Sequence, residues 1–470
     1  MAEIVVVGAG VAGLGTALAL AGRGHRVTVV ERDDVPMPAS PQAAFDQWNR
    51  RGAPQHRHSH AFLARARNVL RDRHPEVLAA LFEAGATEVD FTAHPPPELR
   101  PLAPEPADAD LVGLACRRTT FEWVLRRSVL AQAGVSLTTG TVAGLTAEAG
   151  AVPRVTGVGL AGGDTLNADV VVDAAGRRSA LPRWLAEAGA APVPECEQDT
   201  GIVYSSRFYE VLGDDDPAEH GLVVGDLGCL KYAVFPGDNG TLSITYGVAA
   251  GDAEMRRVLR PGPFTEVAAH LPALRRWVEP GRCRPLGDVE VMAGLVNRLR
   301  RFVVDGRPVA TGVYAVGDSS VCTNPLYGRG CSLALAHAEL LADTLMVVGD
   351  DPEAGALAFA EATRTTIEPW YAASVAQDSH DGGEQAEDDG WADMGSVMRH
   401  GLLPAARRDP VVFRAFMRMW NLLDAPDAAL GDPQVVLRVM AAWQQRASRP
   451  KPAPLGPDRA ELLQILAGAA

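Results

Sequence analysis

The chain has 470 residues, 47% of them hydrophobic and 22% charged, an ordinary composition for a globular protein of two or three domains. A net charge of −14 argues against nucleic acid or an anionic membrane as a principal partner. Six dispersed cysteines argue against a disulfide framework and a metal site, and no apolar run reaches the length of a spanning helix. Because no cleavable leader is evident either, we expect a cytoplasmic protein without stable membrane insertion.

The N-terminal segment "EIVVVGAGVAGLGTALALAGRGHRVTVVERDD" predicts strand, turn, helix and strand in succession. Its β-branched run is typical of a strand buried on both faces. Gly8 allows the tight turn, Gly10 lets a pyrophosphate approach the backbone, and Gly13 lets the helix pack on the strand. The second strand ends on Glu31, which can accept hydrogen bonds from ribose hydroxyls. This arrangement predicts a dinucleotide-binding site.

Two segments further along carry histidines and arginines. In "FDQWNRRGAPQHRHSHAFLARARNVL", His56, His58 and His60 alternate, which would place them on one face of a strand. No carboxylate or thiol accompanies them, so we favour loop packing or polar contacts over a metal site. The proline-rich residues 83–111 are expected to form an excursion on the substrate side. The segment "CRRTTFEWVLRRSVL" then predicts a helix.

Two later strand ends indicate which dinucleotide is bound. "DVVVDAAGRRS" is a buried strand that runs into Gly176, and a glycine after a strand lets the backbone approach a ligand. "VYAVGDSSVCTNPLYGRGCSLALAHAELLADTL" predicts a strand over 313–316, then Gly317 and Asp318, a glycine-rich loop and a long helix. Asp318 can bind a ribityl hydroxyl, and the helix start can stabilise negative charge on a reduced flavin. These features favour FAD over NAD.

Residues 181–284 contain alternating strand patterns separated by Gly, Asp and Pro, which predict an antiparallel sheet covering the flavin. Tyr204, Arg207 and Tyr232 are the candidate substrate-binding residues of this sheet. Tyrosines and an arginine can together hold the polar end of an otherwise apolar molecule.

The last 120 residues are predicted to be helical, with an acidic segment, 378–393, that we expect to be a solvated loop rather than a lid or docking site. The expected packing anchors of this region are Trp370, Trp391, Trp420 and Trp443.

The paired outer motifs resemble those of the FAD-dependent monooxygenase superfamily built on the p-hydroxybenzoate hydroxylase fold. The middle motif "DAAGRRS" and the segment "RRGAPQHRHSH" are most similar to the polyketide-polyene epoxidase and styrene-monooxygenase-like branch. The resemblance implies an α/β fold: a three-layer Rossmann-type FAD-binding domain, an inserted antiparallel β-sheet substrate domain and a C-terminal helical region. The expected boundaries are 1–82, 112–180 and 285–350 for the FAD-binding domain, 83–111 and 181–284 for the substrate-binding domain, and 351–470 for the helical region.

The motifs and the resemblance together imply a set of cofactor-binding residues. The resemblance places Arg51 and Gln55 near the flavin and lets Arg118 contact FAD. It also places the backbone of Val142 beside the adenine. The full set is Gly8, Gly10, Val11, Ala12, Gly13, Glu31, Arg32, Arg51, Gln55, Arg118, Val142, Ala175, Gly176, Gly317, Asp318, Pro325, Gly328, Gly330 and Cys331.

The resemblance implies a monooxygenase that inserts one oxygen atom into an apolar natural-product intermediate, by epoxidation or hydroxylation, through a flavin C4a-hydroperoxide. Electrophilic oxygen transfer needs no protein nucleophile, so no catalytic residue is assigned. Halogenation is disfavoured because no lysine precedes Lys231. Reduction of carbon–carbon double bonds and flavin binding without turnover remain alternatives.

The resemblance also bears on the electron donor. Ala175 stands where aromatic hydroxylases carry an aspartate that serves both FAD and the nicotinamide. We therefore expect NAD(P)H to act through a separate flavin reductase. Direct reduction stays open if Arg177, Arg178 or Arg118 captures the nucleotide's phosphates.

Overall fold

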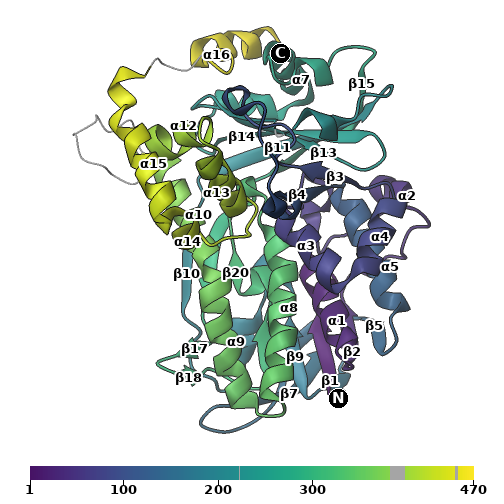
Figure 1. The fold of residues 1–470 in the computed structure, drawn as a ribbon. Coiled ribbons are helices and arrows are strands. Elements are labelled where there is room, and N and C mark those ends of the chain that lie inside the picture. The colour runs from purple at the N-terminus through teal and green to yellow at the C-terminus, as the bar shows by residue number, and fades with distance from the viewer. Residues whose placement is uncertain (222, 382–396, 450–453, 470) are drawn as a thin grey trace.

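In the computed structural model, five strands among the described residues form a parallel sheet in the order β19-β9-β1-β2-β5 (Figure 1). The description covers the chain except residues 222, 382–396, 450–453 and 470. The first strand carries the predicted β-branched run and is buried almost throughout, as a central parallel strand must be. The strand bounds are β1 Glu3–Val7, β2 Arg26–Glu31, β5 Val135–Thr139, β9 Val170–Asp173 and β19 Val313–Ala315.

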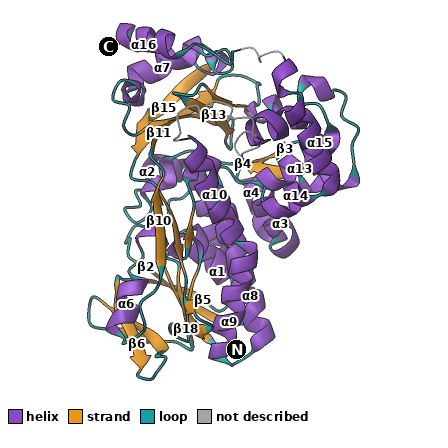
Figure 2. Cartoon of the chain, turned by 90° about the vertical axis from the view of Figure 1, so that its left-hand side faces the viewer, coloured by secondary structure: helices purple, strands orange, loops and turns teal. Residues whose placement is uncertain are grey.

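Helices cover one face of this sheet and a small antiparallel sheet covers the other (Figure 2). On the helical face α1 packs directly against α8. Among the described residues α8 alone is long and apolar enough to cross a membrane, but most of it is buried, as in the core helix of a globular domain. The bounds are α1 Val11–Gly22, α3 Ala64–Arg73, α4 Pro75–Glu83, α5 Arg118–Ala131 and α8 Gly330–Val348 on the helical face, and β6 Val142–Glu148, β7 Arg154–Leu160, β8 Thr165–Asn167 and α6 Leu181–Glu187 on the other side.

A second, antiparallel sheet forms the upper part of the molecule in Figure 1, in the order β12-β13-β14-β11-β15. Two helices, α7 and the C-terminal α16, cover its outer face and complete an apolar core with it. The bounds are β11 Ile202–Val211, β12 Val223–Asp226, β13 Lys231–Pro236, β14 Thr241–Ala249, β15 Cys283–Met292, α7 Pro261–His270 and α16 Arg459–Gly468.

Two predicted domain boundaries are wrong. The expected change of domain at residue 285 falls inside β15, which stays paired with β11 as far as Met292. The region 351–470 is also not one unit, because Leu462 and Leu466 of α16 belong to the core of the antiparallel sheet. Both errors arise because strand pairing and helix docking join segments that are distant in the chain.

The remaining C-terminal helices pack against α8 and against β16 and β20, two strands of a small sheet described below. Trp370 and Trp420 contribute to their apolar core as predicted, Trp443 lies half-buried at its edge, and Trp391 falls outside the described residues. The acidic segment is helical up to its fourth residue, where α10 ends, which corrects the loop prediction for that part. The bounds are α9 Pro352–Thr366, α10 Glu368–Asp381, α12 Leu403–Ala406, α13 Pro410–Trp420, α14 Pro426–Gly431 and α15 Pro433–Gln444.

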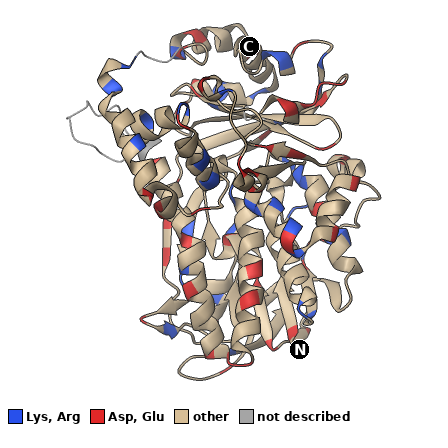
Figure 3. Ribbon diagram, viewed as in Figure 1, with Lys and Arg blue, Asp and Glu red and all other residues tan. Residues whose placement is uncertain are grey.

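Short elements connect these layers. One three-stranded sheet, β10-β16-β20, lies between the two large sheets (Figure 2). Basic and acidic residues are interspersed over the face of the molecule seen in Figure 3. The bounds are α2 Pro41–Gln47, β3 Thr87–Asp90, β4 Val112–Ala115, β10 Glu195–Asp199, β16 Val296–Arg300, β17 Val303–Val304, β18 Arg307–Pro308 and β20 Val321–Cys322.

Candidate functional site

The glycines of the first turn have three distinct structural roles. Gly8 has φ +102°, and a Cβ there would lie 2.8 Å from the Ala174 carbonyl oxygen. A Cβ on Gly13 would lie 1.8 Å from the Gly8 carbonyl oxygen, so the helix packs on the turn itself. A Cβ on Gly10 would meet nothing within 4 Å. Open space therefore adjoins the start of α1, where backbone N–H groups favour an anion.

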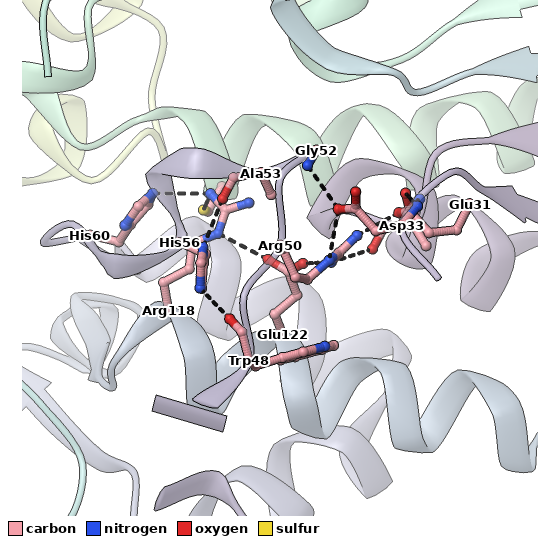
Figure 4. Close-up of polar contacts among 12 residues, drawn as sticks. Glu31, Asp33, Trp48, Arg50, Gly52, Ala53, His56, His60, Arg118 and Glu122 are labelled. Atoms are coloured by element: carbon pink, nitrogen blue, oxygen red, sulfur yellow. Dashed lines mark hydrogen bonds and ion pairs between the residues drawn. The ribbon is translucent and has the colours of Figure 1, made fainter. Parts of the chain in front are cut away.

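Glu31, at the end of β2, is buried in a network of alternating charge (Figure 4). Its carboxylate accepts hydrogen bonds from the Ala9 and Asp33 backbone N–H groups, each at 3.0 Å. Arg50 bridges Glu31 to Glu122 of α5 and also donates to the Ala9 carbonyl oxygen at 2.9 Å. This network fixes the carboxylate predicted to hold a ribose.

The arginine that enters this network corrects the prediction for Arg51. Arg51 is exposed, whereas the Arg50 side chain is only 2% exposed. The motif contains two adjacent arginines, and their order along an irregular segment does not reveal which one turns inward. Sequence reasoning therefore missed Arg50.

Arg118, the first residue of α5, joins three elements. It donates to Glu122 at 3.2 Å, to His60 Nε2 at 3.0 Å and to Cys331 Sγ, in the first turn of α8, at 3.5 Å. Because His60 Nε2 accepts, its Nδ1–H donates to the His58 carbonyl oxygen at 2.9 Å. Burial and the Arg118 charge lower the pKa of His60 well below its ordinary value, so this imidazole is neutral.

The other two histidines have different partners, and the expected strand is absent. Residues Pro54–Arg57 form a 3-10 turn, so the three imidazoles do not share a strand face. His56 lies between the Trp48 and Ala53 carbonyl oxygens, and His58 packs edge-on against Tyr204 at 5.2 Å. The histidines thus make polar and packing contacts, as favoured from the sequence: those of His56 lie within the loop, whereas His58 and His60 also contact other elements.

The "DAAGRRS" turn holds its own acid. Asp173 accepts hydrogen bonds from the Ser179 hydroxyl and, at 3.1 Å, from the Ala175 N–H. Burial raises the pKa of Asp173 to about 6. Gly176 has φ +77° and an open side at its α-carbon, and the Ala175 side chain is exposed. The acid of this motif therefore stabilises the turn.

The segment Gly317–Asp318, which follows β19, lies against the first turn of α1. Gly317 has φ +67°, and a Cβ there would lie 2.9 Å from Ala12 Cβ. Burial raises the pKa of the neighbouring Asp318, while Arg118 and Arg177 lie close enough to oppose that shift. Asp318 therefore lies beside the same arginine that contacts Cys331.

The loop before α8 is fixed on one side and open on the other. Gly328 has φ +65°, and a Cβ there would lie 2.6 Å from Ala61 Cβ. A Cβ on Gly330 would meet nothing within 4 Å. Neither α1 nor α8 has a side-chain cap on its first turn within the described structure, and the Ser332 hydroxyl is buried without a partner there.

Five other predicted cofactor residues lie around this space without a contact that decides their role, and their roles stay predictions. They are Val11, buried at the start of α1; Arg32 and Pro325, both exposed; Gln55, half-buried in the 3-10 turn; and Val142, half-buried at the start of β6.

Of the three predicted substrate residues, only Tyr204 faces the site. It packs on His58 and lies near Arg118 and Arg177. Arg207 is on the opposite face of β11 and donates to Thr265 of α7. Tyr232 belongs to the apolar core between the antiparallel sheet and the helices α7 and α16. Side chains alternate along a strand, so Tyr204 and Arg207 cannot line one cavity.

The residues fit a bound FAD. The uncapped start of α1 beside Gly10 suits the pyrophosphate and Glu31 suits the adenosine ribose. Asp318 is a half-buried carboxyl suited to a ribityl hydroxyl, and the open α-carbon of Gly330 leaves room for a flat ring beside the start of α8. The polar groups of both motifs thus lie close together, where the starts of α1 and α8 adjoin.

Residues 3–107 match the DAO family model, FAD dependent oxidoreductase. With the site just described, this defines the protein as an FAD-dependent oxidoreductase. Over 466 residues the chain is 30% identical to Protein Rv3254 of Mycobacterium tuberculosis (strain ATCC 25618 / H37Rv), covering 90% of each chain, and it belongs to the same family.

Solved structures share the fold. The flavin-dependent brominase Bmp2 is 16% identical, with a TM-score of 0.57 over 100% of this chain and 98% of that one. PqsL from Pseudomonas aeruginosa, a probable FAD-dependent monooxygenase, is 17% identical, with a TM-score of 0.57 over 88% of this chain and 98% of that one. At such identities the likeness shows the fold alone.

Proposed function

We propose that the protein is a monooxygenase that inserts one oxygen atom, by epoxidation or hydroxylation, into an apolar natural-product intermediate. The observation that carries this proposal is an apolar cluster that adjoins His58 and Arg118. Tyr204, Met292 and Leu295 are buried together there, and the Tyr204 hydroxyl donates to Met292 Sδ at 3.2 Å. Burial raises the pKa of Tyr204, so its phenol stays neutral and none of the three cluster side chains carries a charge.

Such a surface suits oxygen transfer to an apolar molecule. When bound, reduced FAD supplies the activation of molecular oxygen. One oxygen atom enters the substrate, the other leaves as water, and NAD(P)H is the ultimate source of the two electrons. The chain's own residues exclude water and orient the substrate, with Arg118 as a fixed positive charge beside the site. Halogenation is not proposed, because no lysine precedes Lys231.

We further propose that the electrons arrive through a separate flavin reductase in the cytoplasm. Ala175 offers no carboxylate for a nicotinamide nucleotide, and Asp173 is engaged within its own turn. The epoxidase-like motif is consistent with this division of labour. Capture of NAD(P)H by Arg177 or Arg178 is the competing route.

The experiment supplies FAD-loaded protein with NADH, a flavin reductase, ¹⁸O₂ and a panel of apolar alkenes that includes styrene. A monooxygenase yields a product that carries one labelled oxygen atom. An anaerobic product heavier by two hydrogen atoms would instead identify a reductase of double bonds. Oxygen consumption without any modified product across the panel would point to flavin binding without substrate turnover.

A further inference from the structure

A carboxylate on α10 holds the loop that leads into α8. Asp378 accepts hydrogen bonds from three side chains: Asn297 Nδ2 at 2.6 Å, Asn324 Nδ2 at 2.8 Å and the Tyr327 hydroxyl at 2.7 Å. These donors lie on β16, at the cap of the 3-10 turn Pro325–Tyr327 and within that turn. One residue, distant in sequence, therefore ties together the strand and the loop.

A second tie runs from the loop back to the same helix. Arg329 donates to the Ser374 hydroxyl at 2.9 Å and to Gln377 Oε1 at 3.0 Å. Its guanidinium lies over the rings of Tyr327, at 4.8 Å, and Trp370, at 5.7 Å. The side chain is buried, and burial lowers the pKa of Arg329 to about 10. Burying the Arg329 cation costs desolvation free energy, which these neutral acceptors and aromatic faces offset. The side chain is therefore stable only while these partners surround it.

Asn324 also holds the loop through its own hydrogen bonds. Its backbone N–H donates to Asn297 Oδ1 at 2.7 Å, and its side-chain oxygen accepts from the Leu326 N–H at 3.0 Å. Both asparagines are almost fully buried. The loop they fix ends at Gly330, whose open α-carbon adjoins the cofactor space.

We propose that Asp378 is a positioning residue for FAD, which sets flavin affinity by holding loop 324–330 and the start of α8 in their binding conformation. Its carboxylate offers acceptors to all three donors, and such charge-assisted hydrogen bonds are stronger than neutral ones. An asparagine at 378 would turn an N–H₂ group toward one of these donors and lose that contact. The proposal does not depend on which reaction the bound flavin performs.

The test titrates FAD into the apoproteins of the wild type and of Asp378→Asn, with flavin fluorescence and the visible circular dichroism of the bound flavin as readouts. We expect the Kd for FAD to rise at least about tenfold in Asp378→Asn. Tyr327→Phe removes one donor but keeps the ring over Arg329, and we expect a smaller rise. Glu361→Gln removes an exposed ion pair with Arg364 on α9, and we expect an unchanged Kd.

A charge-swap variant separates positioning from general destabilisation. In Asn297→Asp/Asp378→Asn the carboxylate moves to the other side of the same contact, so that residue 378 donates to residue 297 and still accepts from the loop. We expect this double variant to recover most of the FAD affinity and the dichroism of the bound flavin. A Kd within about twofold of the wild type in Asp378→Asn would overturn the proposal. Loss of affinity that follows the melting temperature of the apoprotein and is not rescued by the swap would also overturn it.

Discussion

Arg50 offers the sharpest test of the buried charge network. Its side chain is 2% exposed and lies between the carboxylates of Glu31 and Glu122, whose side chains are 7% and 1% exposed. Arg50→Met keeps the length of the side chain but leaves both carboxylates without their shared cation. Removing one partner of a buried ion pair costs about 3–5 kcal/mol.

The structure indicates the lower part of that range. Glu122 keeps its hydrogen bond from Arg118, and Glu31 keeps two backbone N–H donors. We therefore expect the free energy of unfolding of the apoprotein to fall by about 3 kcal/mol, with weaker FAD binding because Glu31 loses its orientation.

The assay is urea unfolding of the apoprotein, followed by titration with FAD. Arg51→Met is the matched control, since the neighbouring side chain is exposed, and we expect a change within about 0.5 kcal/mol. An equal loss in both variants, or a loss below about 1 kcal/mol in Arg50→Met, would refute the assignment of the network to Arg50.

Four further predictions follow from the same site. Gly10→Val should leave the apoprotein folded but abolish FAD binding, because its side chain enters open space, whereas Gly13→Ala should destabilise the fold itself by clashing with the turn; full flavin content in Gly10→Val would contradict the site. Folding raises the pKa of Asp173 from 3.8 to about 6, so its stabilising contribution is present below about pH 4 and is lost as the pH rises through 6. The free energy of unfolding of Asp173→Asn, measured with urea, should therefore rise relative to that of the wild type by up to about 3 kcal/mol as the pH goes from 4 to 8. A difference between the two proteins that does not change with pH would argue against the pKa shift. Tyr204→Ala should raise KM or change the position of oxygenation with flavin content intact, and loss of FAD would mean a structural role. NADH or NADPH alone should reduce the flavin slowly in anaerobic stopped-flow mixing, and bleaching within seconds without a reductase would favour direct reduction.

The sequence by itself determined the features that depend on neighbours in the chain. Gly8 and Gly13 meet local steric requirements at the turn between a β-branched strand and an apolar helix, and the structure confirms both; the role of Gly10 toward the pyrophosphate stays a prediction. Asp318 after its strand and the long helix beyond it were predictable for the same reason. Each of these features requires only that one strand end and one helix start adjoin.

The tertiary structure decided which side chains meet across the chain. Arg50 rather than Arg51 turns inward because Glu31 and Glu122 approach it from two other elements, and no local pattern encodes their distance. Arg207 lies away from the site because α7 covers the outer face of its strand. Burial of charge is affordable only where an opposite charge or several donors converge, and that convergence depends on how the layers pack.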